Sequence, residues 1–249
     1  AATVLLVDDL VSDDIVAYAK PGARIVHVGK RGGCKSTPQE FIEKMMIMAV
    51  REGENVVRLK GGDPFIFGRG GEEVEHLRSA GIEVQVINGI TAGLAAVTSL
   101  GVPLTHRDHA HGVLLVTGHA RSGEPALHWP TLAAAAAQGL TLVVYMGVAT
   151  AEDLQRGLLE GQATLVIYMG VSGAGRIQDE LLAGLPASTP VAVIQNASMP
   201  TQRHITTTLG GLANAIDASG IASPSVIVVG DVISGVAAAA EFPAHSRVA

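Results

Sequence analysis

Cysteine is nearly absent from this 249-residue sequence, since Cys34 is the only one. A single cysteine excludes an internal disulfide framework and a zinc site built from cysteines alone, and it favours a reducing cytoplasmic location. Charged residues make up only 16% of the chain and the formal net charge is -6. Binding of nucleic acid along a broad basic surface is therefore not expected, because phosphate neutralisation needs an excess of lysine and arginine.

The sequence also has no signal peptide and no uninterrupted apolar run long enough to cross a membrane. The most apolar stretch, from Leu132 to Val148, is broken by Gln138, Gly139 and Thr141. The chain opens on Ala1 without an initiator methionine and enters a predicted strand almost at once. We therefore expect an N-terminally clipped piece of a longer protein.

What the sequence does contain is a regular alternation of β-rich and helical segments. Its length predicts two α/β domains, the first over residues 1–105 and the second over 111–249. In the first domain we predict strands at 4–7, 24–28, 56–59 and 84–87, and helices at 38–51, 72–79 and 91–100. In the second we predict strands at 113–116, 142–145, 165–168, 191–194 and 226–229, with an antiparallel edge at 205–209.

The second half contains a near repeat. TLVVYMGVATAEDLQRGLLEG begins at Thr141, and TLVIYMGVSGAGRIQDELLAG begins 23 residues later at Thr164. Two copies are too few for a solenoid. The pattern indicates a local tandem duplication, or one introduced when the sequence was recorded.

The richest motif is LKGGDPFIFGRGGEE, which starts at Leu59 and follows a predicted strand. Glycines directly after a strand let a ligand approach the backbone, so we interpret this segment as a ligand loop. A Gly-Gly-Asp turn alone is equally typical of a tight connection. The longer string is more specific when it is combined with GKRGG at Gly29, NGITAG at Asn88, PLTHRD at Pro103, VTGH at Val116 and TPVAVIQNAS at Thr189.

In order and spacing these motifs resemble the uroporphyrinogen-III C-methyltransferases of the tetrapyrrole methylase family. The resemblance implies a two-domain fold with a parallel-rich N-terminal sheet, a mixed C-terminal sheet and an active site in the cleft between them. It also implies that the first strand and a glycine-rich loop are missing before Ala1. The implied reaction transfers methyl groups from S-adenosylmethionine to uroporphyrinogen III, which gives precorrin-2 for sirohaem or cobalamin. A homodimer is the implied assembly.

The resemblance also implies roles for individual residues. Asp8 would be the base, and Lys30 the acid or a carboxylate anchor. Arg69, Glu72 and Arg107 would bind substrate. The eight carboxylates of the substrate call for cations, and Arg31 and Lys60 are further candidates beside Lys30, Arg69 and Arg107. The implied S-adenosylmethionine positions are Gly61, Gly62, Asp63, Ile66, Thr91, Ala92, Ala197 and the methionine of YMG, which is either Met146 or Met169.

Each assignment has a plainer alternative. Asp8 would then be a turn residue, Lys30 a solvated charge and Glu72 a helix N-terminal carboxylate. The side chains of His106, Asp108, His109 and His111 are of the types that bind metals, but a histidine-rich hinge is the better interpretation, and we expect no metal. Two other functions remain open: a sibling precorrin methyltransferase, and a non-catalytic nucleotide-binding module.

Overall fold

The computed structural model describes residues 2–29, 37–107, 110–118, 128–146, 164–168 and 170–233. Within these ranges the chain divides into two compact units, Ala1–Thr91 and Ala92–Ala249. The predicted division lay later, between residues 105 and 111. The difference arises from helix α4 (Ala92–Ser99), which packs on the second unit: the Gly93 N–H donates to the Tyr145 hydroxyl at 3.1 Å.

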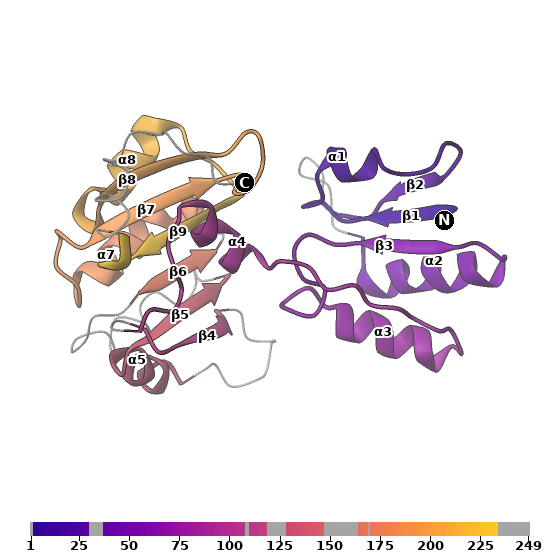
Figure 1. The fold of residues 1–249 in the computed structure, drawn as a ribbon, viewed down its shortest axis with the longest axis horizontal. Coiled ribbons are helices and arrows are strands. Elements are labelled where there is room, and N and C mark those ends of the chain that lie inside the picture. Colours follow the sequence, from indigo (N-terminus) through magenta and orange to yellow (C-terminus); the bar gives the residue numbers. More distant parts are fainter. Residues whose placement is uncertain are drawn as a thin grey trace. The chain divides into compact units, whose positions relative to one another are not determined.

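The first unit is a small parallel sheet with helices (Figure 1). Its elements are β1 (Val4–Val7), α1 (Asp13–Val16), β2 (Arg24–His27), α2 (Gln39–Arg51), β3 (Val56–Leu59) and α3 (Gly70–Ser79). The strand order is β2-β1-β3, with both neighbours parallel to β1. The central strand is fully buried because its residues are all branched aliphatics.

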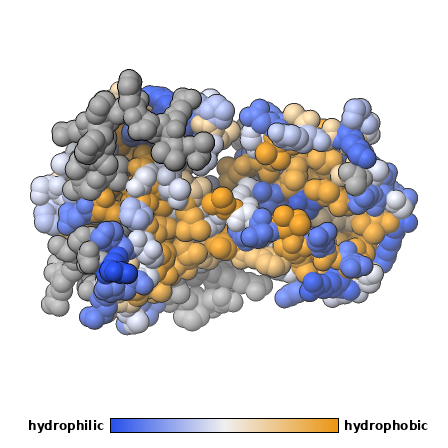
Figure 2. All heavy atoms as spheres, in the orientation of Figure 1, coloured by the Kyte–Doolittle hydropathy of each residue, from blue (hydrophilic) through white to orange (hydrophobic). Residues whose placement is uncertain are grey.

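The core of this unit joins the sheet to α2 and α3. It contains Val4, Leu6, Val28, Ile42, Met46 and Leu77. Other large apolar side chains are exposed, among them Tyr18, Phe41 and Met48. Figure 2 shows apolar surface on the visible face of this unit, bordered by hydrophilic residues.

One predicted strand of the first unit is wrong. Residues 84–87 form no strand. Their β-branched composition suits a strand, but a strand also needs a neighbour that completes its hydrogen-bond ladder, and β1 is the only neighbour of β3 within the described residues. Val84 instead packs on the core of the unit, whereas Ile87 is exposed.

The second unit is a mixed sheet with the strand order β4-β5-β6-β9-β7-β8. Besides α4, its elements are β4 (Gly112–Thr117), α5 (Trp129–Ala137), β5 (Leu140–Tyr145), β6 (Leu165–Tyr168), α7 (Ala174–Leu182), β7 (Pro190–Gln195), β8 (Arg203–Thr208), α8 (Leu212–Ser219) and β9 (Ser225–Val229), with short 3-10 turns at Val171–Gly173 and Leu209–Gly211. Strands β4, β5 and β6 are parallel, and β9 is antiparallel to both of its neighbours.

The threonine-rich segment forms the edge strand β8, antiparallel to β7, as predicted. Alternating exposed and half-buried residues mark it as an edge. Strand β9 is buried along its whole length, and β5 and β7 are buried except at half-buried terminal residues. The core of the unit includes Leu142, Val144, Leu165, Ile167, Ile177, Leu181, Val193, Leu212 and Ile227.

The near repeat has a direct structural counterpart, because its two copies form the adjacent parallel strands β5 and β6. Leu142 pairs with Leu165 and Val144 pairs with Ile167, a separation of 23 positions in each case. Each residue of this four-residue pairing therefore lies beside its own counterpart in the other copy. The pairing ends on Tyr145 and Tyr168, whose ring centroids are 5.8 Å apart.

No helix in the ranges given above combines the length and the apolar character that a membrane span requires.

Candidate functional site

The predicted residues of the first unit gather at one edge of its sheet. All three strands are parallel, so their carboxyl ends meet there. Asp8 directly follows β1, Gly29 comes two residues after β2, and the Lys60–Gly61–Gly62 segment directly follows β3. In open α/β sheets this edge is where ligands bind.

Glycines allow the loops at this edge to touch. A Cβ on Gly61 would lie 2.8 Å from the Leu10 Cβ, and one on Gly89 would lie 2.3 Å from the Gly62 carbonyl oxygen. Gly62 itself has φ +77, a conformation that other residues rarely adopt. The loop after β1, the loop after β3 and the Asn88–Gly89 segment therefore contact one another. We call these three segments together the rim.

Asp63 holds this rim together. Its Oδ1 accepts the Phe65 N–H at 2.8 Å and its Oδ2 accepts the Gly89 N–H at 3.1 Å. Both carboxylate oxygens thus bind backbone groups of the protein. Direct contact between Asp63 and S-adenosylmethionine stays a prediction, next to this observed role in joining two loops.

Asp8 is well placed for chemistry because it is held and yet accessible. Its Oδ1 accepts the Asp9 N–H at 3.0 Å, its Oδ2 accepts from Arg58 Nη2 at 3.4 Å, and its side chain is 36% exposed. Arg58 was not predicted, because in the sequence it is typical of an ordinary strand residue. Lys30 and Arg31 lie outside the described residues.

Two of the predicted cations are already paired within the chain. The Lys60 side chain is only 8% exposed, and its Nζ lies 3.2 Å from Glu73 Oε1. A role for Lys60 in binding substrate stays a prediction. Arg69 is exposed and pairs with Glu72 at 2.5 Å. The hydrogen bond to Glu72 raises the pKa of Arg69 above its usual value, with burial acting in the opposite direction, so this side chain stays charged.

Further residues predicted to bind the cofactor lie close in sequence to this rim. Ile66 is half-buried in the loop after β3, and Thr91 is buried. Ala92 begins α4 in the second unit.

The second unit has its own carboxyl edge. Strand β7 is antiparallel to β9, and β9 is antiparallel to β6, so β5, β6 and β7 all end at the same side. Met146 follows β5 with φ 58, and Ala197 follows β7 between Asn196 (φ 50) and Ser198 (φ 66). Left-handed backbone at residues other than glycine is uncommon and concentrates at functional sites.

Of the two candidate methionines, only Met146 lies in the described residues. The preceding Tyr145 accepts the N–H of Gly93, and a Cβ on Gly93 would lie 2.7 Å from the Tyr145 hydroxyl. The start of α4, which carries Ala92, is therefore in contact with β5, the strand that directly precedes Met146. Met169 lies outside the described residues.

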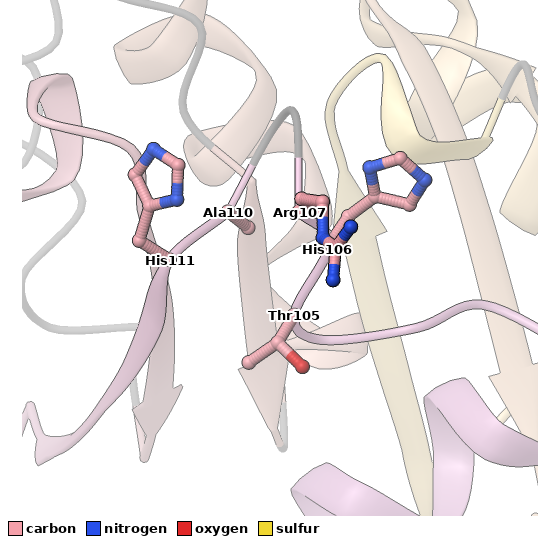
Figure 3. A pocket seen from close by; sticks show the side chains of 5 residues that line it. All are labelled: Thr105, His106, Arg107, Ala110 and His111. Carbon is pink, nitrogen blue, oxygen red and sulfur yellow. The ribbon is translucent and has the colours of Figure 1, made fainter.

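Arg107 lines an open pocket of about 340 Å³ in the second unit, together with Thr105, His106, Ala110 and His111 (Figure 3). His106 and Ala110 form an isolated antiparallel bridge through two backbone hydrogen bonds of 2.8 and 2.9 Å. In Figure 3 the two imidazoles lie on either side of the Arg107 guanidinium. The guanidinium of Arg107 in this pocket suits a carboxylate ligand.

We predicted that this histidine-rich hinge binds no metal. Two of its residues, Asp108 and His109, lie outside the described residues. Among the residues that the structure does describe, no three His, Cys, Asp or Glu side chains come together as a metal site would require.

Comparison with known proteins gives a consistent result. The model of the family "Tetrapyrrole (Corrin/Porphyrin) Methylases" matches residues 1–162 and 149–213. The chain belongs to the tetrapyrrole methylase family. The two matched segments overlap within the first copy of the repeat.

Among curated relatives, a uroporphyrinogen-III C-methyltransferase of Pseudomonas aeruginosa is 46% identical over 93% of this chain and 83% of its own length. A sirohaem synthase of Edwardsiella ictaluri is 43% identical over 94% of this chain, which spans 44% of that longer protein.

Among solved structures, a uroporphyrin-III C-methyltransferase from Thermus thermophilus complexed with S-adenosylhomocysteine is 33% identical. It covers 94% of this chain and 88% of its own, with a TM-score of 0.64. A cobalt precorrin-4 methyltransferase is 26% identical and covers 93% and 85%, with a TM-score of 0.70.

Proposed function

We propose that this protein transfers methyl groups from S-adenosylmethionine to ring carbons of uroporphyrinogen III to give precorrin-2, which feeds sirohaem or cobalamin synthesis. The observation that carries the proposal is the position of Asp8. It lies at the carboxyl edge of the first sheet, held at both oxygens and still accessible, on the same rim as the Gly61–Gly62 loop. The 46% identity to a uroporphyrinogen-III C-methyltransferase supports the choice of substrate.

The rim suits the methyl donor. Gly61 and Gly62 are exposed, so their backbone groups are accessible to the polar edges of an adenosine, and the half-buried Ile66 supplies an apolar wall nearby. Met146 and Ala197, at the left-handed turns of the second unit, and Thr91 and Ala92, beside α4, are the further positions that we assign to this ligand.

The reaction requires little covalent chemistry from the protein. An electron-rich ring carbon attacks the methyl carbon as the carbon–sulfur bond breaks, and the electron pair stays on sulfur. The methylated macrocycle then loses a proton, which we assign to Asp8, while Lys30 serves as the acid or as a carboxylate anchor. Arg69, Glu72 and Arg107 hold the substrate through its carboxylates and pyrrole N–H groups.

Asp8→Asn tests the proposal. The amide keeps size and shape but removes the base, so turnover should fall about 100-fold or more while the affinity for S-adenosylhomocysteine is unchanged. Methylated product is followed with time for the wild type and the variant. If Asp8→Asn turned over at the wild-type rate, Asp8 would have no part in the mechanism.

A sibling precorrin methyltransferase is the second candidate, and the TM-score of 0.70 to the cobalt precorrin-4 enzyme favours it. Supplying the wild type with uroporphyrinogen III and with a later precorrin separates the two. We also infer that the protein is a cytoplasmic homodimer, on the strength of the family resemblance and the single cysteine. Light scattering on the purified protein tests the dimer.

A further inference from the structure

Behind the rim of the first unit lies a cluster of charged side chains centred on Glu73. This residue belongs to the first turn of α3 and is only 4% exposed. Its Oε1 accepts from Gln39 Nε2 at 2.9 Å, from Arg58 Nε at 3.2 Å and from Lys60 Nζ at 3.2 Å. A buried carboxylate persists only when partners like these compensate its lost hydration.

Arg58 connects this buried cluster to Asp8. Its guanidinium donates to Glu73 through Nε and to Asp8 through Nη2, and its Nη1 donates to the Leu59 carbonyl oxygen at 3.0 Å. The planar guanidinium of Arg58 is thus held by hydrogen bonds at all three of its nitrogens. Because Glu73 and the carbonyl set the plane of the guanidinium, the position of Nη2 is determined before any ligand arrives.

The charges in this group balance, and only one member is exposed to a substantial degree. Arg58 and Lys60 contribute two positive charges, and Glu73 and Asp8 two negative charges. The side chains of Arg58, Lys60 and Glu73 are 11%, 8% and 5% exposed, against 36% for Asp8. Asp8 is therefore the accessible end of an otherwise enclosed network.

We propose that Arg58, oriented by Glu73, is a positioning residue for Asp8. This inference rests on the proposed function, in which Asp8 takes the proton from the methylated macrocycle. The Asp9 N–H holds one oxygen of Asp8 and Arg58 Nη2 holds the other, so the carboxylate plane is set from two sides. A base held in this way meets the ring carbon in one orientation, and small displacements of a reacting group lower the rate steeply.

A double-mutant cycle tests the inference. Arg58→Met should lower kcat about 10- to 100-fold with little change in the KM for S-adenosylmethionine, because the base is misplaced while the cofactor loop remains. In the Asp8→Asn background the same change should lower kcat by less than about 2-fold, since there is no base left to position. Arg58→Lys, which keeps the charge but not the fork, should recover part of the activity.

The controls separate positioning from folding. Arg51→Met removes an exposed arginine of the same unit and should leave kcat unchanged. If Arg58→Met does not fold, the cycle is run with Arg58→Met/Glu73→Gln, which removes one charge of each sign and keeps the cluster balanced.

Two results would overturn the positioning role of Arg58, and they have different consequences for the proposed function. An equal loss of kcat from Arg58→Met in both backgrounds would mean that Arg58 acts apart from Asp8, and the proposed function would stand. Wild-type kcat in Asp8→Asn alone would overturn the role of Asp8 and the positioning role together.

Discussion

Individual side chains decide which ligand each part of the site recognises. Arg69 and Arg107 lie at exposed positions of different units, and each is available to a carboxylate: Arg69 through exchange of its Glu72 partner, Arg107 from the wall of an open pocket. The segment proposed to bind the cofactor, by contrast, depends on close backbone approaches at Gly61 and Gly89. Substrate and cofactor binding should therefore respond to different substitutions.

Arg69→Gln should weaken uroporphyrinogen III binding by roughly 1.5–3 kcal/mol, the usual worth of a charged hydrogen bond, and leave S-adenosylhomocysteine binding nearly intact. Arg107→Gln should behave likewise. Arg176→Gln is the matched control, because Arg176 also forms an exposed carboxylate pair, with Glu180, but belongs to α7. Calorimetric titration measures both ligands, and equal loss of the two would mean that these arginines support the fold.

Gly89→Ala should weaken S-adenosylhomocysteine binding about 5- to 150-fold. The added methyl group would lie 2.3 Å from the Gly62 carbonyl oxygen, so the loop must move, and overpacking of this kind costs about 1–3 kcal/mol. Gly175→Ala adds the same atom in α7 with nothing within 4 Å and should leave affinity unchanged. Titration with S-adenosylhomocysteine provides the comparison, and a change of less than about 2-fold in Gly89→Ala would show that the rim is not part of the cofactor site.

At the scale of the element, strands were predictable wherever β-branched runs were bounded by polar residues. Periodicity located β1, β3, β7 and β9, and the threonines marked β8 as an edge. It failed at residues 84–87, because the ladder partner that makes a strand is not encoded in the segment itself. Arg58 and Glu73 were missed for a similar reason: their roles depend on contact between β3 and α3, which no local pattern specifies.

The contact between α4 and β5 gives a test at this scale. Tyr145→Phe removes the acceptor of the buried Gly93 N–H, so the free energy of unfolding should fall by about 1–3 kcal/mol. Tyr168→Phe, the same change in the second copy of the repeat, is the control. Burial, with a smaller effect of Tyr145, raises the pKa of Tyr168 above its usual value, so its hydroxyl stays protonated at neutral pH.

Urea unfolding of the two variants gives the comparison. Tyr168→Phe should cost less than about 1 kcal/mol, the net worth of an ordinary hydrogen bond. An equal loss in both would show that the α4 contact adds nothing to the stability of the second unit.

For the whole molecule, the net charge of -6 is compatible with a polyanionic substrate because recognition depends on local cations rather than on the overall balance. The choice between a methyltransferase and a nucleotide-binding module also belongs to this scale. After the two glycines that follow β3, Gly61 and Gly62, the chain continues with Asp63 and Pro64. Helix α3 begins after Arg69, whose side chain is already paired with Glu72. A phosphate loop would instead place a lysine and a serine or threonine at the helix start.

S-adenosylhomocysteine should therefore stabilise the protein and ATP should not. At about 100 times its dissociation constant, a ligand that binds only the folded state contributes roughly 2.7 kcal/mol. For a chain of this size that corresponds to a rise in Tm of roughly 5–10 °C. Thermal unfolding with each ligand in turn makes the comparison, and a shift with ATP alone would favour the nucleotide-binding module.

The paired copies in β5 and β6 have one more consequence, for how a sheet can grow. Identical segments stacked parallel and in register are the arrangement of cross-β fibrils, in which each chain is a template for the next. In this sheet the in-register pairing of similar segments is limited to β5 and β6, because their outer neighbours β4 and β9 have different sequences. Both copies lie inside the sheet, and within the described residues its borders are β4 and β8, so neither copy is an unpaired edge on which another molecule could assemble.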